Sequence, residues 1–149
     1  MRFSLKSEYA LRAALDLALH ASPSQLARTS DVALRTGAPA KFLEAVLGQL
    51  GRAGLVESER GSRGGHRLAR APSRIGAGEV VRAVEGPEAL SVRPAQRRPS
   101  PGAAVASARA LHQLWTEAER ALAASLDGVS LEDLARRVQE SSGVPDFSI

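Results

Sequence analysis

The residues of this chain best suited to bind an anion lie close together at positions 60–65. Two of them, Arg60 and Arg63, carry guanidinium groups. The others are small, and they are Gly61, Ser62, Gly64 and Gly65. Glycine permits positive φ and lets a backbone approach a sugar–phosphate chain closely, and arginine favours a narrow, electronegative minor groove. This stretch therefore predicts a hairpin tip that contacts duplex DNA.

A second group of candidate contact residues begins a predicted helix over residues 39–53, and its members are Pro39, Ala40, Lys41 and Glu44. Lys41 would contact a base edge or a phosphate, or would simply be solvated. Glu44 repels phosphate, so it suits a DNA-facing surface only if it accepts from a cytosine amino group or rejects wrong sequences. The alternative is an ion pair with Lys41 on the same helix face. The sequence leaves both interpretations of Glu44 open.

These residues would be positioned by two helices joined by a tight turn. Apolar-periodic segments at residues 31–36 and 39–53 are separated by Gly37 and Ala38. Pro39 suits the first position of the second helix because its missing N–H costs nothing there. The apolar stripe of that helix comprises Phe42, Leu43, Val46, Leu47 and Leu50. Such a helix–turn–helix suits insertion into the major groove.

A two-stranded wing is predicted to follow. Gly54 suits the helix C-terminus, and residues 55–59 and 66–69 are the predicted strands on either side of the tip. A basic hairpin in this place suits the DNA backbone or the minor groove. Three further arginines would contact phosphate or be solvated, and they are Arg67, Arg70 and Arg74.

The starts of two other predicted helices offer further candidate phosphate contacts. The first helix is predicted over residues 4–21, where Ser4 or Ser7 can cap its start. The second begins near Thr29 and Ser30, either of which would cap it. Hydroxyl groups and helix N–H groups at such positions bind phosphate, although capping alone would explain Thr29 and Ser30. The candidates at both starts are Lys6, Ser7, Tyr9, Thr29 and Ser30.

Composition and charge agree with a helical, DNA-binding protein. Of the 149 residues, 44% are hydrophobic and only 3% aromatic, which favours closely packed helices over a β-sandwich. Residues 1–86 hold 13 Lys and Arg against 8 Asp and Glu, a net +5, whereas residues 87–149 hold 7 against 8, a net −1. Positive charge is thus concentrated where the DNA-binding elements are predicted, although a solvated basic face would give the same asymmetry.

Several function classes are excluded or poorly supported. The chain has no cysteine, which rules out disulfides, thiolate-bound zinc and cysteine-held iron–sulfur clusters. An enzyme is poorly supported, because His20, His66 and His112 are far apart in sequence and no nucleophile–base motif accompanies them. No apolar run approaches the ~20 residues that span a bilayer, and the start lacks an apolar signal core. We expect a soluble, cytoplasmic protein without a membrane partner.

The C-terminal part is predicted to pair two copies of the chain. The helix predicted over residues 107–126 has apolar residues spaced as in a coiled coil, and these are Ala108, Leu111, Trp115, Ala118 and Leu122. Pairing would place two DNA-binding domains, which we call reading heads, on the two halves of a palindromic site. The alternative is that this helix folds back onto the domain of its own chain. The predicted organisation is a winged-helix domain at 1–86 that ends in a short helix over 75–84, a flexible loop at 87–106, a dimerisation helix and a Ser130-capped short helix at 107–138, and a tail at 139–149.

An ordered set of motifs resembles the bacterial Rrf2 family of winged-helix regulators (IscR/NsrR/CymR type). The main motifs are YALRAAL at 9–15, FLE at 42–44, GLV at 54–56, RG at 60–61, GG at 64–65, VVRAVEG at 80–86, LW at 114–115 and LDGVSLEDL at 126–134. The resemblance covers about residues 1–138. It implies a mainly α fold with a small β-wing and a long dimerisation helix that includes Leu114. It also implies a homodimeric, sequence-specific regulator, usually a repressor, of a palindromic operator on double-stranded DNA.

The sequence departs from that family at the position of its cofactor. Many members hold an iron–sulfur cluster through three cysteines ahead of the long helix, sometimes with a histidine or a carboxylate of the first helix. This chain has Val92, Arg97, Ala103 and Arg109 near those places. His112 and Glu8 match the positions of the other ligands, but without thiolates we interpret both as ordinary polar residues and expect no cofactor. An alternative function is a protein-interaction regulator that keeps the winged-helix fold and controls, or is controlled by, a partner protein or another effector.

Overall fold

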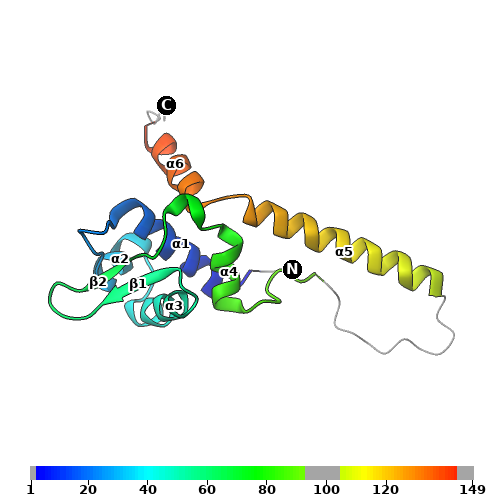
Figure 1. The fold of residues 1–149 in the computed structure, drawn as a ribbon, viewed down its shortest axis with the longest axis horizontal. Helices are drawn as coiled ribbons and strands as arrows, with labels where there is room; N and C mark the ends of the chain where they lie inside the picture. Colours follow the sequence, from blue (N-terminus) through cyan, green and yellow to red (C-terminus); the bar gives the residue numbers. More distant parts are fainter. Residues whose placement is uncertain (1–2, 93–104, 144–149) are drawn as a thin grey trace, which may run out of the picture.

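The computed structural model describes residues 3–92 and 105–143 and contains mainly helices with one two-stranded antiparallel wing (Figure 1). The elements are α1 (Leu5–His20), α2 (Thr29–Thr36), α3 (Ala40–Arg52), β1 (Val56–Glu59), β2 (Gly65–Leu68), a 3₁₀ turn η1 (Pro72–Arg74), α4 (Ala77–Glu85), α5 (Val105–Asp127) and α6 (Leu131–Ser142). The predicted fold class is confirmed. Most of the predicted loop at 87–106, including Arg97 and Ala103, lies outside the described residues, as does the chain after position 143.

The core of the N-terminal domain forms where α1 crosses α3 and α4. Ala10, Ala13 and Ala14 of α1 are at most 2% exposed, and such small side chains let the helices approach closely. The opposing apolar stripe of α3 is buried, and its buried members are Leu43, Val46, Leu47 and Leu50. Few aromatic rings are needed in such a core, in agreement with the composition.

A partly buried ion pair joins α1 to α2. Asp16 is only 6% exposed, and its two carboxylate oxygens accept hydrogen bonds from Nε and Nη2 of Arg35, each at 2.8 Å. The bidentate geometry satisfies a charge that would be costly to bury alone, and it raises the pKa of Arg35. The pair therefore holds the first helix of the helix–turn–helix against the core.

Each of the two helices of the helix–turn–helix starts one or two residues away from its predicted start. Arg28 is the N-cap of α2, and Thr29 and Ser30 are its first two helical residues, so the expectation that either caps the helix is wrong. Pro39 is the N-cap of α3 and not its first residue. Gly37 has φ 72°, which lets the chain turn sharply between the two helices.

The end of α3 is fixed by backbone hydrogen bonds. The Gly54 N–H donates to Gly51 O at 3.0 Å, and the Leu55 N–H donates to Leu50 O at 2.9 Å. With Gly54 at φ 75°, this is a Schellman motif, as the glycine predicted. It directs the chain straight into β1 and so sets the wing beside α3.

The two C-terminal helices lie outside this domain's core to different degrees. Figure 1 shows α5 as a straight rod that extends away from the domain, at the opposite end of the molecule from the wing. None of its 23 residues is buried. By contrast, α6 packs on α1 through the fully buried Leu131, and it continues to Ser142, so the predicted tail at 139–149 begins too early. No helix in the described ranges is long and apolar enough to span a membrane.

Candidate nucleic-acid interface

The exposed face of α3 carries the residues predicted to face DNA. Lys41 and Glu44 are exposed, while Leu43 and Leu47 of the same helix are buried. Lys41 and Glu44 form no ion pair with each other, so the structure does not support the alternative in which Lys41 neutralises Glu44. The remaining exposed residues of α3 are small or cationic, and they are Ala40, Ala45, Gly51 and Arg52.

The wing tip is a tight turn that requires its glycines. The strands pair in register from Val56 opposite Leu68 to Glu59 opposite Gly65, which leaves residues 60–64 to make the turn. Gly61 has φ 106°, and a Cβ atom on Gly64 would lie 2.2 Å from the Glu59 carbonyl oxygen. A larger residue at Gly64 would push against the backbone of Glu59, and one at Gly61 would be strained by its positive φ.

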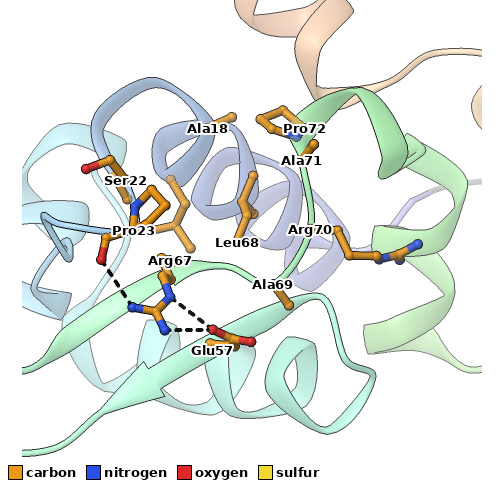
Figure 2. Close-up of a pocket in the computed structure, with 12 residues that line it drawn as sticks. Ala18, Ser22, Pro23, Glu57, Arg67, Leu68, Ala69, Arg70, Ala71 and Pro72 are labelled. Atoms are coloured by element: carbon orange, nitrogen blue, oxygen red, sulfur yellow. Dashed lines mark hydrogen bonds and ion pairs between the residues drawn. The ribbon is translucent and has the colours of Figure 1, made fainter.

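Arg60 and Arg63 at this tip are exposed, and neither forms an ion pair. Arg67, on the second strand of the wing, is paired instead, as Figure 2 shows at the hollow between α1, the wing and η1. There Arg67 bonds to Glu57 at 2.9 Å and also contacts Glu59 at 3.2 Å. These carboxylates neutralise Arg67 across the wing. The two tip arginines keep their charge available.

The other two arginines whose role the sequence left open also differ from each other. Arg70 bonds to Glu79 at 2.7 Å, which lowers the pKa of Glu79. Arg74 is exposed and forms no ion pair, although its carbonyl oxygen accepts from Arg70. Arg70 therefore links the end of the wing to α4 through its ion pair. Of these two arginines, Arg74 is the one that remains available to an anion.

The wing is fixed to the helix–turn–helix through His66. Its backbone pairs with Ala27 through two hydrogen bonds of 2.8 and 2.9 Å. Its ring bonds through Nε2 to Thr29 Oγ1 at 2.8 Å and through Nδ1 to Ser58 Oγ at 2.6 Å. Burial lowers the pKa of His66, so the ring is neutral at neutral pH. One neutral ring thus connects β1, β2 and α2.

Ser7 does not lie on the DNA-binding surface as predicted. It is 1% exposed, and its hydroxyl donates to the Glu85 carboxylate at 2.8 Å. The Ser4 hydroxyl donates to the same carboxylate while also capping α1, and these bonds lower the pKa of Glu85. The carboxylate of Glu85 therefore occupies the helix N-terminus where a phosphate was expected, and the buried Ser7 is not available to DNA.

The other predicted contacts at helix starts are also partly used within the protein. The ring of Tyr9 packs edge-on against Phe42 with centroids 5.4 Å apart. The Thr29 hydroxyl is bonded to His66. Lys6 is half-buried, and only Ser30 is fully exposed. These residues support the surface more than they form it.

Comparison with known proteins decides the family. A family model named Rrf2 and described as an iron-dependent transcriptional regulator matches residues 3–137. The chain belongs to the Rrf2 family. It is therefore a transcriptional regulator with a DNA-binding helix–turn–helix, and not an enzyme. The predicted resemblance is confirmed.

Individual Rrf2 relatives agree over nearly the whole chain. The transcriptional regulator IscR of Aliivibrio salmonicida is 34% identical over 134 residues, which are 90% of this chain and 77% of the relative. The protein rrf2 of Nitratidesulfovibrio vulgaris is 35% identical, over 91% of this chain and 88% of the relative. Among solved structures, CymR, the global cysteine regulator of B. subtilis, superposes with a TM-score of 0.75 at 30% identity, covering 92% of this chain and 98% of CymR.

The iron dependence in the family description does not fit the residues of this chain. A cluster needs thiolate ligands, and the chain has no cysteine. Glu8 is bonded to Arg12 at 2.8 Å, and His112 is exposed on α5. Among the residues that the structure describes, no group of His, Asp and Glu could hold a metal ion. This Rrf2 protein cannot bind an iron–sulfur cluster through thiolates of its own.

The helix α5 has no buried residue and leaves large apolar side chains exposed. Leu111 and Leu114 of α5 are 53% and 52% exposed. Trp115, Ala118 and Leu122 are half-buried, whereas Ala108 is exposed. The helix contacts α4 but is not folded back over the domain (Figure 1), which disfavours the alternative interpretation of its apolar seam.

Two cationic residues of the surface were not singled out from the sequence. Arg52 is exposed on α3, eleven residues after Lys41 and hence on the same helix face. Arg28 precedes α2, and its guanidinium donates to the Ser62 carbonyl oxygen in the wing tip. Helical spacing from Lys41 would have identified Arg52. Arg28 had no such signal, because its contact depends on the folded wing.

Proposed function

We propose that this Rrf2 protein acts as a homodimeric repressor that binds a palindromic operator with α3 in the major groove and the wing tip in the minor groove. The observation that carries the proposal is the distribution of unpaired cations. Lys41, Arg52, Arg60 and Arg63 are exposed without ion pairs on α3 and the wing tip. By contrast, five arginines of the same domain form ion pairs with carboxylates of the chain, and they are Arg12, Arg35, Arg67, Arg70 and Arg82.

The proposed contacts divide into positioning and reading roles. Arg60 and Arg63 reach phosphates and the minor groove, where the small residues Gly61, Ser62 and Gly64 let the backbone approach. Gly65 is buried in β2 and supports the tip from within. On α3, Lys41 and Glu44 meet base edges next to Pro39 and Ala40. Glu44 discriminates, since it accepts from cytosine amino groups and repels other approaches.

Dimerisation completes the proposal. A two-fold pair of α5 helices buries the exposed seam of Ala108, Leu111, Leu114, Trp115, Ala118 and Leu122, and each copy then presents one head to one half-site. The protein works in the cytoplasm, where the bacterial chromosome lies. Because it lacks cluster thiolates, its signal comes from another effector or a partner protein.

The proposal is tested by selecting operator sites from genomic fragments and measuring affinity by fluorescence anisotropy as salt increases. Each phosphate contact contributes about −0.9 to the slope of log affinity against log salt. We expect an enriched two-fold-symmetric site and a steep negative slope. An affinity that does not weaken between low and moderate salt contradicts DNA binding through the proposed cations. Stoichiometric capture of one partner protein without an enriched DNA site would favour the protein-interaction alternative.

A further inference from the structure

The long helix α5 meets the N-terminal domain at one small set of contacts, between residues 75–82 and residues 127–131; we name this set the α5 joint. Gly76 and Ser130 pair across it as an isolated antiparallel bridge. Two backbone hydrogen bonds of 2.9 Å flank the bridge, from Ala77 N–H to Val129 O and from Leu131 N–H to Ile75 O. The turn that ends α5 is therefore joined to the start of α4 almost as a strand is joined to a sheet.

A bidentate ion pair completes the α5 joint. Nη1 and Nη2 of Arg82 donate to the two carboxylate oxygens of Asp127, each at 2.8 Å. Arg82 lowers the pKa of Asp127, so the carboxylate is ionised at neutral pH. A paired planar contact of this kind fixes direction as well as distance. It therefore constrains the angle at which α5 leaves the domain.

Two glycines at the start of α4, the N-cap Gly76 and Gly78, show how close this approach is. A Cβ atom on Gly78 would lie 1.9 Å from Asp127 Oδ1, and one on Gly76 would lie 3.1 Å from the Asp127 carbonyl oxygen. An alanine at position 78 would displace the carboxylate from its present place against Arg82. The sequence of α4 thus leaves room for the Asp127 side chain and for little else.

The angle at this joint has a large effect at the far end of α5. The helix has 23 residues, none of them buried, and at 1.5 Å per residue it is about 35 Å long. A rotation of about 10° at the joint moves the far end of such a rod by about 6 Å. That displacement exceeds the rise of one base pair along the duplex, which is about 3.4 Å. Small changes at the joint are therefore large changes on the scale of DNA.

We propose that the Arg82–Asp127 pair sets the separation of the two reading heads in the dimer, and hence the spacing between operator half-sites that the protein accepts. This inference rests on the proposed dimeric DNA binding. Once two α5 helices are paired, the position of each head relative to the pair depends on the α5 joint. Arg82 and Asp127 are positioning residues, since they act on DNA only through the placement of α3 and the wing.

The test uses the selected operator with its half-sites moved closer or further apart by one and two base pairs. Affinities are measured for the wild-type protein, for Arg82→Gln, and for the matched control Arg136→Gln, which removes an exposed ion pair with Asp133 on α6. We expect the wild type and the control to lose about tenfold in affinity for each base pair of changed spacing, a loss comparable to one mismatched pair. For Arg82→Gln we expect a loss of about tenfold at the best spacing and a spread of less than about threefold across the series.

Gly78→Ala provides a second variant that keeps both charges, and it is expected to broaden or shift the preferred spacing in the same way. Circular dichroism and light scattering establish that each variant is folded and dimeric. Equal weakening of Arg82→Gln at every spacing would overturn the inference, as would an unchanged preference in both variants. A wild type that binds DNA without any spacing preference overturns this inference alone. A wild type that binds no duplex overturns the proposed function and the inference with it.

Discussion

The N-terminal domain and α5 use their side chains in opposite ways. In the domain, each of α1, α3 and α4 buries several apolar side chains, some at 0% exposure, whereas α5 has no buried residue at all. A 23-residue helix with Leu111 and Leu114 more than half exposed gains little from its own chain. The comparison agrees with the proposed dimer, in which a second copy of the chain covers the apolar residues that α5 leaves exposed.

The same contrast separates two groups of arginines within the domain. Arg35, Arg67, Arg70 and Arg82 are each bonded to carboxylates of the same chain. Arg63 at the wing tip has no such partner. The paired arginines therefore organise the fold, whereas Arg63, like Arg60 beside it, is left for an external anion.

The largest effect is expected from Leu114→Asp. A carboxylate in the seam would have to be buried between two α5 helices, at a cost of several kcal/mol. We expect a monomer by light scattering and an affinity for the full operator reduced by about 100-fold or more, because two half-sites no longer bind together. Leu34→Asp, at an 84% exposed position of α2, is the control and should leave the mass of a dimer. A dimeric Leu114→Asp protein would show that α5 does not pair through this seam.

A smaller effect, on affinity alone, is expected from Arg63→Ala. Loss of one phosphate contact should weaken binding broadly across sequences, by about 1 kcal/mol or somewhat more, and make the salt slope shallower by about 0.9. Arg67→Ala is the matched comparison, because Glu57 and Glu59 already neutralise that guanidinium. It should leave the salt slope nearly unchanged. Equal changes in slope for the two variants would contradict the division into paired and unpaired arginines.

A still smaller change in overall affinity is expected from Glu44→Ala, with the main effect on sequence preference. Removing a carboxylate that faces phosphate takes away a repulsion, so affinity for unselected DNA should increase slightly. Discrimination at the base pair that Glu44 meets should decrease by about 1–3 kcal/mol. Site selection with both proteins measures this difference. Identical selected sites would remove Glu44 from the reading surface.

The parts of the structure that the sequence predicted are those determined by near neighbours. The order of the helices, the apolar stripe of α3 and the glycine that ends it depend on residues a few positions apart. Most of the predicted bounds moved by one or two residues, and the end of α6 moved from 138 to 142. The wing followed from its glycines and its place after α3. Local periodicity and turn chemistry are sufficient for such features.

The errors about side-chain contacts concern residues whose partners are distant in sequence. Ser7 was predicted to bind phosphate, but Glu85 bonds to it from 78 positions away. Thr29 was predicted to cap α2, but its hydroxyl is bonded to His66, 37 positions later. A helix-start hydroxyl has the same local sequence whether it binds a phosphate, caps the helix or meets an internal partner. The fold alone decides among these outcomes.

The smallest expected effect concerns His66, which joins the wing to α2. Burial lowers the pKa of His66 below its ordinary 6.5. As pH falls through 6.5, the unfolded chain therefore binds a proton at this position before the folded chain does. The contribution of His66 to the free energy of unfolding is complete above pH 6.5. It decreases as the pH falls from 6.5 to the lowered pKa of the folded state, and it changes no further below that pKa.

This pH dependence can be isolated with His66→Gln, which keeps a donor and an acceptor but does not titrate. Urea unfolding of both proteins at about pH 8 and about pH 5 gives the difference in the free energy of unfolding at each pH. We expect the wild type to lose stability relative to the variant at the lower pH, while wing-dependent DNA affinity decreases with it. A difference that is constant across pH would mean that the folded and unfolded states protonate His66 alike. The ring would then join the wing to α2 by its hydrogen bonds to Ser58 and Thr29 without any penalty for charge.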